Sequence, residues 1–317
     1  MSIIMEEKNN TTLKILALDG GGSKGVYTLG VLKELELKLG IPLHQHFDLI
    51  FGTSTGSIIA ALVALGYDIP AIEKLYFELI PKIMSGKSRA EKSSILKSEA
   101  DRIFDGKKFD AFKTDIGIVA LNYDTQKPLI FKSSVKQAHG MVHSFEPGFG
   151  KTISEAVQCS SAAYPIFDIV NIDLINKESK TNVNLIDGGF IANDPTLFAL
   201  IDAHKAFGKQ IEDIRLISVG VGEYIEKPLG FWYNLFHKVN MVKFIERVLA
   251  ANTNTNVLVA KLLFPNLKMI RINDAFPEPD YGTNMIENDL NKLRKINSLG
   301  RGSFAKKETE IENLFMQ

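Results

Sequence analysis

The sequence predicts an α/β fold in which a mostly parallel sheet carries helices on both faces. Short apolar runs alternate with longer stretches whose apolar residues recur at helical spacing. The connections between the first runs are short and rich in glycine, as in strand–turn–helix units. Hydrophobic residues make up 45% of the 317 residues and charged residues 23%, an ordinary globular composition that allows a large buried core.

The N-terminal part contains two strand–turn–helix units in succession. The first apolar run, Leu13–Leu18, ends at an aspartate and three adjacent glycines, and residues 26–39 then carry leucines at helical spacing. Residues 47–51 form the second apolar run, which is followed by the sequence GTSTG and an apolar helix over 57–65. Strands that alternate with helices in this way favour parallel pairing.

Further elements are expected in the middle and C-terminal parts. Residues 81–113 are polar and are expected to form short helices over the site or on its rim. Two apolar runs separated by the sequence YDTQK predict a hairpin. The expected elements after residue 113 are hairpin strands at 116–122 and 128–132, a helix over 151–163, strands at 183–186, 215–221 and 267–272, and a helical stretch over 230–264.

Charge and cysteine content exclude several function classes. Lys plus Arg and Asp plus Glu number 37 each, so the formal net charge is zero and no cationic excess indicates a nucleic-acid partner. The single cysteine, Cys159, cannot form an intrachain disulfide or a cysteine metal cluster, which favours a reducing, cytoplasmic location. The sequence shows no secretory signal and no apolar stretch of membrane-spanning length, so lipid is expected to be met at a membrane surface by peripheral contact.

The sharpest chemical signal is the sequence Gly52–Thr53–Ser54–Thr55–Gly56, between an apolar strand and an apolar helix. This G-x-S-x-G pattern is typical of a strained strand–helix turn that exposes a nucleophilic serine, and the flanking glycines let the backbone pass close by. The helix that follows directs the positive end of its dipole toward the serine. The pattern predicts Ser54 as a nucleophile, and a tight turn with an unreactive serine is the structural alternative.

The loop Asp19–Gly25, of sequence DGGGSKG, admits two interpretations. Three of its glycines satisfy the dinucleotide-binding pattern G-x-G-x-x-G, but the next strand lacks the acidic residue that would bind the ribose. Successive backbone N–H groups in such a loop also form an anion-binding nest, which would serve Ser54 as an oxyanion hole. Ser23 in this loop fits G-x-S-x-G as well. We favour Ser54 because three adjacent glycines suit the donation of N–H groups.

Asp187 is the candidate base. It follows the expected strand at 183–186 and precedes Gly188 and Gly189. An aspartate at a strand end of an α/β sheet lies where ligands and catalytic groups gather, and glycine after it lets a substrate approach. Taken alone, an Asp-Gly surface turn is the commoner explanation of this triplet.

The motifs DGGGSKG, GTSTG and DGG, in this order, resemble those of the patatin-like phospholipase family. The stretch SSAAYPIF at 160–167 and the sequence Asn193–Asp194–Pro195 also resemble that family's pattern. The resemblance covers about residues 13–205 and implies a three-layer α/β/α fold, a Ser–Asp dyad and hydrolysis of acyl esters of lipids. Lys24 departs from the family, which usually has arginine at this position, so a salt bridge or phosphate contact there is in doubt.

The resemblance also implies a role for each motif. Ser54 is the nucleophile, Asp187 takes its proton, and water releases the fatty acid without a metal or an organic cofactor. The expected partner is a membrane phospholipid or another acyl lipid at a membrane surface. The implied residues are Gly20, Gly21, Gly22, Lys24 and Gly25 for the oxyanion hole, Gly52, Thr53, Thr55 and Gly56 for the turn around the nucleophile, and Asp187, Gly188 and Gly189 for the DGG motif.

Four segments are expected along the chain. Residues 1–12 are an N-terminal tail, and residues 13–205 form the catalytic domain that the resemblance covers. Residues 206–300 are expected to complete the sheet and to add helices, and residues 301–317 to form a charged tail, as an exposed helix or a loose end. Residues 230–264 are expected either to pack as core helices or to contact a membrane.

Other functions stay open at this point. The chain could be a generic serine esterase with a Ser-His-Asp triad, a nucleotide-binding Rossmann protein, or a patatin-shaped scaffold without catalysis. Bacterial members of the family include effectors that a signal switches on, and the sequence leaves regulation of this chain open. The histidines lack metal-ligand company of convincing spacing and are expected at the surface or in the core; they are His44, His46, His139, His143, His204 and His237.

Overall fold

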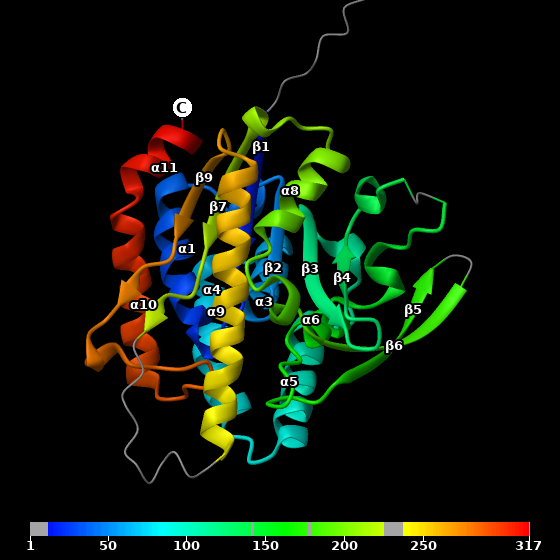
Figure 1. Ribbon diagram of the computed structural model, residues 1–317, viewed down its shortest axis with the longest axis vertical. Helices are drawn as coiled ribbons and strands as arrows, with labels where there is room; N and C mark the ends of the chain where they lie inside the picture. The colour runs from blue at the N-terminus through cyan, green and yellow to red at the C-terminus, as the bar shows by residue number, and fades with distance from the viewer. Residues whose placement is uncertain (1–11, 141–142, 177–178, 225–236, 317) are drawn as a thin grey trace, which may run out of the picture.

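The computed structural model describes residues 12–140, 143–176, 179–224 and 237–316. One sheet lies in the middle of the molecule, with helices on both of its faces (Figure 1). Its strands follow the order β5-β6-β3-β2-β1-β7-β9, with β4 paired to β3. The strands are β1 (Leu13–Leu18), β2 (Leu49–Thr53), β3 (Asp115–Asn122), β4 (Lys127–Lys132), β5 (Val170–Asn176), β6 (Ser179–Asp187), β7 (Ile214–Val219) and β9 (Lys268–Ile272).

The centre of the sheet is parallel and one edge is antiparallel. β1 pairs in parallel with β2 on one side and with β7 on the other. The pairs β2–β3 and β7–β9 are parallel as well. β6 runs antiparallel to β3, and β4 and β5 extend that edge as antiparallel partners of β3 and β6. The expected mostly parallel sheet and the hairpin of β3 with β4 are therefore confirmed.

Two apolar cores form on the two faces of the sheet, because side chains alternate along each strand. In β1, Leu16 and Leu18 join the core beneath α1, α3 and α10, whereas Leu13 and Ile15 join the core beneath α8. The helix α9 packs against α7 and α8 on that second face (Figure 1). The helices are α1 (Gly25–Leu39), α2 (Leu43–His46), α3 (Thr55–Ala64), α4 (Ile69–Met84), α5 (Arg89–Phe104), α6 (Ile153–Ser160), α7 (Gly189–Ala192), α8 (Thr196–Lys205), α9 (His237–Leu263), α10 (Leu290–Ala305) and α11 (Glu308–Phe315).

Several sequence-based boundaries differ from the structure. The second strand starts at Leu49, because Phe47 ends the short helix α2 and packs in the core. Residues 81–113 do not form a set of short helices: α4 continues through Pro81, and α5 is one helix of 16 residues whose start Ser88 caps. The helix expected over 151–163 is confined to α6. Of the expected helical stretch 230–264, residues up to 236 lie outside the described part.

The segment expected as a charged tail, residues 301–317, is largely helical in its described part, but it packs on the body and is not a loose end. The residues complete α10 and form α11, whose Ile311 and Phe315 are buried. The ring centroid of Phe315 lies 5.8 Å from that of His46 and 6.0 Å from that of Phe47. Apolar packing therefore holds the charged segment on the body. Of the expected N-terminal tail, residues 1–11 lie outside the described residues.

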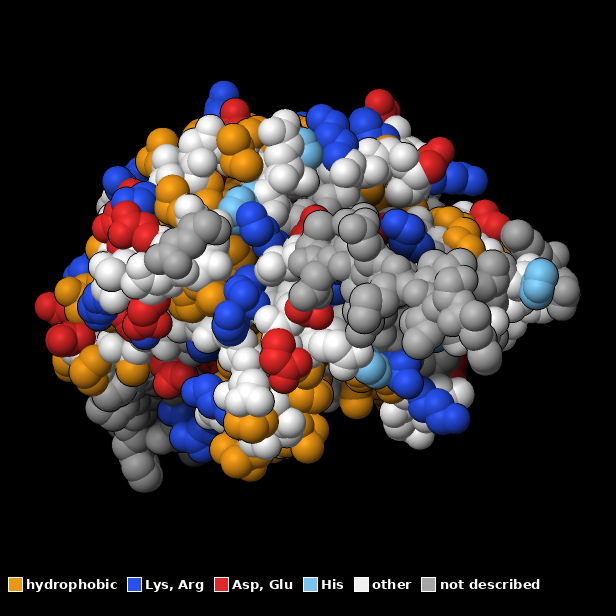
Figure 2. Space-filling model, turned by 90° about the horizontal axis from the view of Figure 1, so that it is seen from above, with side chains coloured by type: hydrophobic (Ala, Val, Ile, Leu, Met, Phe, Trp, Pro, Cys, Tyr) orange, Lys and Arg blue, Asp and Glu red, His pale blue; other side chains and the backbone are white. Residues whose placement is uncertain are grey.

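The surface agrees with the balanced composition. On the face shown in Figure 2, basic and acidic side chains are interspersed and do not gather by sign. Among the described residues, no helix combines the length and apolar character needed to cross a bilayer.

The helices α1 and α10 cross at a distance that only glycine permits. A Cβ atom on Gly30 would lie 2.1 Å from the carbonyl oxygen of Asn297, and one on Gly300 would lie 2.1 Å from that of Tyr27. The Asn297 side chain also donates a hydrogen bond to the carbonyl oxygen of Val26 at 3.0 Å. Because α1 follows the glycine-rich loop directly, this contact ties the loop to the C-terminal part of the chain.

Gly300→Ala is expected to lower the free energy of unfolding by about 1–3 kcal/mol, because the added methyl group overlaps the backbone of α1. Gly302→Ala in the same helix is the matched control, since nothing lies within 4 Å of its Cβ position. That change is expected to raise the free energy of unfolding by about 0.5–1 kcal/mol by restricting the unfolded chain. Urea unfolding followed by circular dichroism measures both. Equal midpoints for the two variants would contradict the close crossing.

Candidate active site

Ser54 lies in a strained turn between β2 and α3. Its backbone angles are φ 53° and ψ −125°, outside the regions that side-chain-bearing residues normally adopt. A Cβ atom on Gly52 would lie 2.4 Å from the carbonyl oxygen of Gly56, and one on Gly56 would lie 2.3 Å from that of Leu18. The flanking glycines are therefore required by close backbone approach, as the G-x-S-x-G pattern predicts.

Neighbouring side chains fix this turn. The Ser54 amide donates a hydrogen bond to Ser160 Oγ at 2.9 Å, and Ser160 Oγ donates to the carbonyl oxygen of Val119 at 2.6 Å. Thr53 Oγ1 donates to the carbonyl oxygen of Ala192 at 2.7 Å. The Thr55 hydroxyl lies 3.2 Å from Tyr76 Oη. Ser160 of helix α6, bound to β3, and helix α7 thus hold the turn from two sides.

Asp187, the last residue of β6, meets Ser54. Ser54 Oγ donates a hydrogen bond to Asp187 Oδ2 at 2.6 Å, and the Gly189 amide donates to Asp187 Oδ1 at 2.7 Å. A Cβ atom on Gly188 would lie 2.1 Å from the carbonyl oxygen of Val119, so the chain can pass β3 here only with glycine. Burial raises the pKa of Asp187 to about 7, against the opposing effect of the two hydrogen bonds.

The loop Asp19–Gly25, here called the glycine loop, offers fewer free amides than its sequence suggests. The Gly20 amide donates to the carbonyl oxygen of Asn193 at 3.0 Å, and the Gly25 amide caps the helical turn before it. Among the described residues, the amides of Gly21 and Gly22 have no hydrogen-bond acceptor. Gly20 lies against the nucleophile candidate, because a Cβ atom there would be 3.1 Å from Ser54 Cβ. Of the glycine amides expected to form the oxyanion hole, those of Gly21 and Gly22 therefore stay available for it.

The remaining two residues of the predicted set have structural contacts. Lys24 Nζ forms an ion pair with Glu246 of α9 at 3.0 Å, so a cation at this position keeps a salt bridge without the arginine fork. A Cβ atom on Gly25 would lie 2.5 Å from Thr55 Oγ1, which explains why the loop needs glycine where it touches the turn. The rival Ser23 is buried, and its hydroxyl has no partner in the described part of the chain.

An apolar cavity of about 80 Å³, here called the acyl cavity, opens beside Ser54. Ser54, Gly22 and Ser23 form part of its wall. Side chains of α4 and α5 form much of the rest, and nearly all are aliphatic or aromatic: Tyr76, Leu79, Ile80, Ile83, Met84, Leu96, Ile103 and Phe104. Such a wall suits a hydrocarbon chain and offers few polar partners to water.

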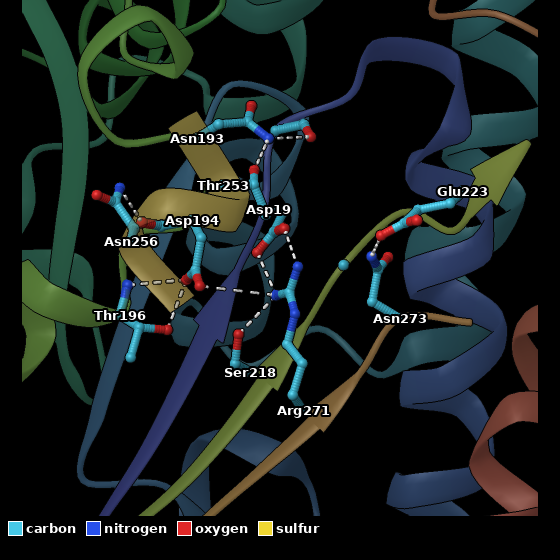
Figure 3. A network of polar contacts seen from close by, with 12 residues as sticks. Asp19, Asn193, Asp194, Thr196, Ser218, Glu223, Thr253, Asn256, Arg271 and Asn273 are labelled. Atoms are coloured by element: carbon cyan, nitrogen blue, oxygen red, sulfur yellow. Dashed lines mark hydrogen bonds and ion pairs between the residues drawn. The ribbon is translucent and has the colours of Figure 1, made fainter. Parts of the chain in front are cut away.

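Arg271 of β9 is a site residue that the sequence analysis missed. Its Nη1 and Nη2 atoms donate to the two carboxylate oxygens of Asp19 at 2.7 and 2.6 Å, and Nη1 also donates to Ser218 Oγ at 2.7 Å (Figure 3). Asp194 Oδ2 lies 3.9 Å from Arg271 Nη1. Burial raises the pKa of Asp19 to about 7, and the guanidinium opposes this shift. An arginine within an apolar strand was the sequence signal for a buried ion pair. Its partner, Asp19, could not be identified from the sequence because it lies 252 residues away.

Asn193 joins the glycine loop to α9. Its side-chain amide donates to the carbonyl oxygen of Gly20 at 3.2 Å and to Thr253 Oγ1 at 2.8 Å (Figure 3). Its backbone amide donates to Asn252 Oδ1 at 2.8 Å. Asn193, the first residue of the sequence Asn193–Asp194–Pro195 that resembles the family pattern, therefore links the glycine loop to α9.

Histidine does not contact the Ser54–Asp187 pair in the described part of the chain. His139 lies 2.6 Å from Asp202 Oδ1, away from the pair, and His46 packs against aromatic rings. The side chain of His237 lies outside the described residues. In the same described residues, no three His, Cys, Asp or Glu side chains form a group that could hold a metal ion.

Comparison with known proteins identifies the family. The model of the patatin-like phospholipase family matches residues 16–200. The chain is 44% identical over 315 residues to a cUMP-AMP-activated phospholipase of Escherichia coli, and the match covers 99% of this chain and 98% of that protein. It is 30% identical over 244 residues to a cGAMP-activated phospholipase of Pseudomonas aeruginosa, with 70% of this chain and 68% of that protein covered. The protein therefore belongs to the patatin-like phospholipase family and is a bacterial-type hydrolase of acyl lipids.

Proposed function

We propose that Ser54 is the nucleophile of this lipid hydrolase and that Asp187 is its general base. The observation that carries the proposal is the 2.6 Å hydrogen bond from Ser54 Oγ, which lines an apolar cavity, to Asp187 Oδ2. A carboxylate that already accepts the hydroxyl hydrogen can take the proton without a histidine between them. The raised pKa of Asp187, about 7, makes it a better base than an exposed aspartate.

The reaction then runs in two steps. Ser54 Oγ attacks the ester carbonyl carbon while its proton passes to Asp187, and the protonated Asp187 gives that proton to the leaving alcohol oxygen. Water attacks the resulting acyl-serine and gives a proton to Asp187, and Ser54 recovers it as the fatty acid leaves. We assign the oxyanion of both intermediates to the amides of Gly21 and Gly22, since neither has an acceptor among the described residues.

The substrate class follows from the acyl cavity. A fatty acyl chain along α4 and α5 would bury apolar surface and bring its ester carbonyl to Ser54. Such a lipid resides in a membrane, so we propose that the protein makes peripheral contact with the bilayer surface. Met241 and Phe244 of α9 are exposed, and they are apolar side chains of the kind that insert at such an interface.

We also propose that a cyclic dinucleotide activates the enzyme. The Escherichia coli relative is named a cUMP-AMP-activated phospholipase and matches over 99% of this chain. The Pseudomonas aeruginosa relative is named a cGAMP-activated phospholipase. Shared descent over the full chain supports a similar activator here, which would make this protein an effector of a nucleotide signal.

Ser54→Ala and Asp187→Asn are each expected to lower kcat for a chromogenic acyl ester by at least about 10³-fold, because they remove the nucleophile or the base. Ser23→Ala is the matched control and keeps most of the activity. A fluorophosphonate probe followed by mass mapping identifies the reactive serine. Modification at Ser23, or a folded His→Gln variant as inactive as Ser54→Ala, would overturn the dyad.

The pH dependence of kcat/KM is expected to report Asp187. The base must be ionised to accept a proton, so the rate constant rises as pH increases through about 7 and is constant above it. Below that pH it falls about tenfold for each unit, because the ionised fraction falls in that proportion. Thermal melts over the same pH range separate titration from unfolding. A rate constant that is unchanged from pH 5 to pH 8 would contradict the assignment.

Leu96→Phe is expected to shift the preference toward short acyl chains, because the larger ring shortens the acyl cavity. If the ring excludes about two methylene groups of a long chain, about 0.8 kcal/mol of burial is lost for each of them. The ratio of kcat/KM for p-nitrophenyl palmitate to kcat/KM for p-nitrophenyl butyrate is then expected to fall about tenfold. Leu37→Phe is the control, since Leu37 is exposed on α1 outside the cavity. An unchanged palmitate-to-butyrate ratio in Leu96→Phe would place the acyl chain elsewhere.

A further inference from the structure

A second cavity, of about 470 Å³, lies at the carboxyl ends of β1, β7 and β9 and is here called the loop cavity. Its wall includes Gly222 after β7, Asn273 after β9, and Arg247 and Asn254 of α9. Ligands of open α/β sheets bind in crevices at the carboxyl ends of the strands. The volume also lies in the range of about 300–1,000 Å³ that is typical of small-molecule sites.

The glycine loop separates the loop cavity from the acyl cavity. Gly20 and Gly21 line the loop cavity, whereas Gly22 and Ser23 line the acyl cavity beside Ser54. A molecule in the loop cavity would therefore touch the same short segment to which we assign the oxyanion hole.

Several polar groups of the loop cavity have no partner within the described part of the chain. Tyr224 Oη and Thr283 Oγ1 are buried there without a hydrogen bond, and Thr283 is only 8% exposed. The side chains of Arg247 and Asn254 are exposed and form no hydrogen bond or ion pair with a described residue, so an incoming molecule can reach them. Buried unpaired groups such as the hydroxyls of Tyr224 and Thr283 require an explanation in a native structure, and a ligand supplies one.

One exposed cation of the loop cavity, Arg247, suits an anion. Two of the three carboxylates that line it pair with cations, since Asp19 binds Arg271 at 2.6 Å and Glu246 binds Lys24 at 3.0 Å. The third, Glu223, accepts a hydrogen bond from the uncharged side chain of Asn273 at 3.0 Å. The guanidinium of Arg247 can therefore bind an incoming anion, and its planar fork matches two phosphate oxygens. Amide and hydroxyl side chains, which both donate and accept, suit the edge of a nucleobase.

We propose that the loop cavity is the binding site of the activating cyclic dinucleotide, with Arg247 on a phosphate and with Asn254 and Thr283 on a nucleobase. The inference rests on the proposed activation by such a molecule. A phosphodiester is shared by a cyclic dinucleotide and by a phospholipid head group. The dinucleotide fits better because base-directed amide and hydroxyl groups line the cavity beside the single arginine.

Contacts between α9 and the glycine loop would transmit binding to the oxyanion hole. Glu246 of α9 accepts from Lys24 at 3.0 Å and from the Met285 amide at 2.7 Å, and the Met285 carbonyl accepts from the Ser23 amide at 2.9 Å. A ligand held by α9 and the loop together selects one arrangement of the Gly21 and Gly22 amides. Activation follows if that arrangement binds the ligand more tightly than the others do.

Calorimetry on the full chain tests the site. Titration of Ser54→Ala protein with cUMP-AMP and with cGAMP is expected to show saturable binding of at least one of them. Adding Arg247→Ala to this protein should raise Kd at least about tenfold, the effect of losing one charge-assisted hydrogen bond. The matched control is Arg294→Ala, an exposed arginine of α10 that does not line the cavity. With Ser54 present, the half-activating concentration should rise with Kd in Arg247→Ala.

The outcomes distinguish a failure of the proposed dinucleotide site from a failure of the proposed catalysis by Ser54. Binding of neither dinucleotide, or equal Kd values with and without Arg247→Ala, overturns the loop cavity as the site, while hydrolysis by the Ser54 protein still supports the proposed catalysis. Arg247-dependent binding of glycerophosphocholine without binding of a dinucleotide would make the cavity a head-group site and also overturn the proposal. Dinucleotide binding that depends on Arg247 supports the site even if the Ser54 protein hydrolyses no ester.

Discussion

The backbone of Ser54, at φ 53° and ψ −125°, is the constraint on which the site depends. Such a conformation costs about 1–3 kcal/mol and persists only where the surroundings enforce it. Here β1 passes within van der Waals range of Gly56, and Ser160 binds the Ser54 amide at 2.9 Å. The strain is thus offset by the packing of several strands and helices, and it points the hydroxyl at Asp187.

The site is assembled from both ends of the chain. The motifs that carry chemistry lie before residue 190, but Arg271 holds Asp19 in place, and the Met285 carbonyl binds the Ser23 amide at 2.9 Å. β7 and β9 complete the sheet beside β1, so the segment after residue 205 shares its hydrogen bonds with the catalytic segment. The proposed catalysis and its proposed control therefore both depend on one continuous sheet, and α9 contacts the glycine loop through the ion pair of Glu246 with Lys24.

Burial raises the pKa of two carboxylates of the site, Asp19 and Asp187, to about 7, but the two have different partners. Asp19 faces a guanidinium at 2.6 Å and serves to position the loop. Asp187 accepts hydrogen bonds from a hydroxyl and an amide, and no cation among the described residues forms an ion pair with it. Burial without a counter-charge destabilises the ionised form, which is unfavourable for folding near neutral pH but useful in a base. The fold thus retains a group that a more stable protein would replace.

Local patterns in the sequence determined the first strand, the turn at Ser54, the hairpin of β3 with β4 and the candidate pair Ser54 and Asp187. These features depend on side-chain alternation, helical spacing and glycines, which act over a few residues. The order of the strands, the partner of Arg271, the loss of the Gly20 and Gly25 amides to internal hydrogen bonds, and the packing of Phe315 were decided only by tertiary structure. Each depends on contacts between residues far apart in the chain, whose geometry no single segment specifies.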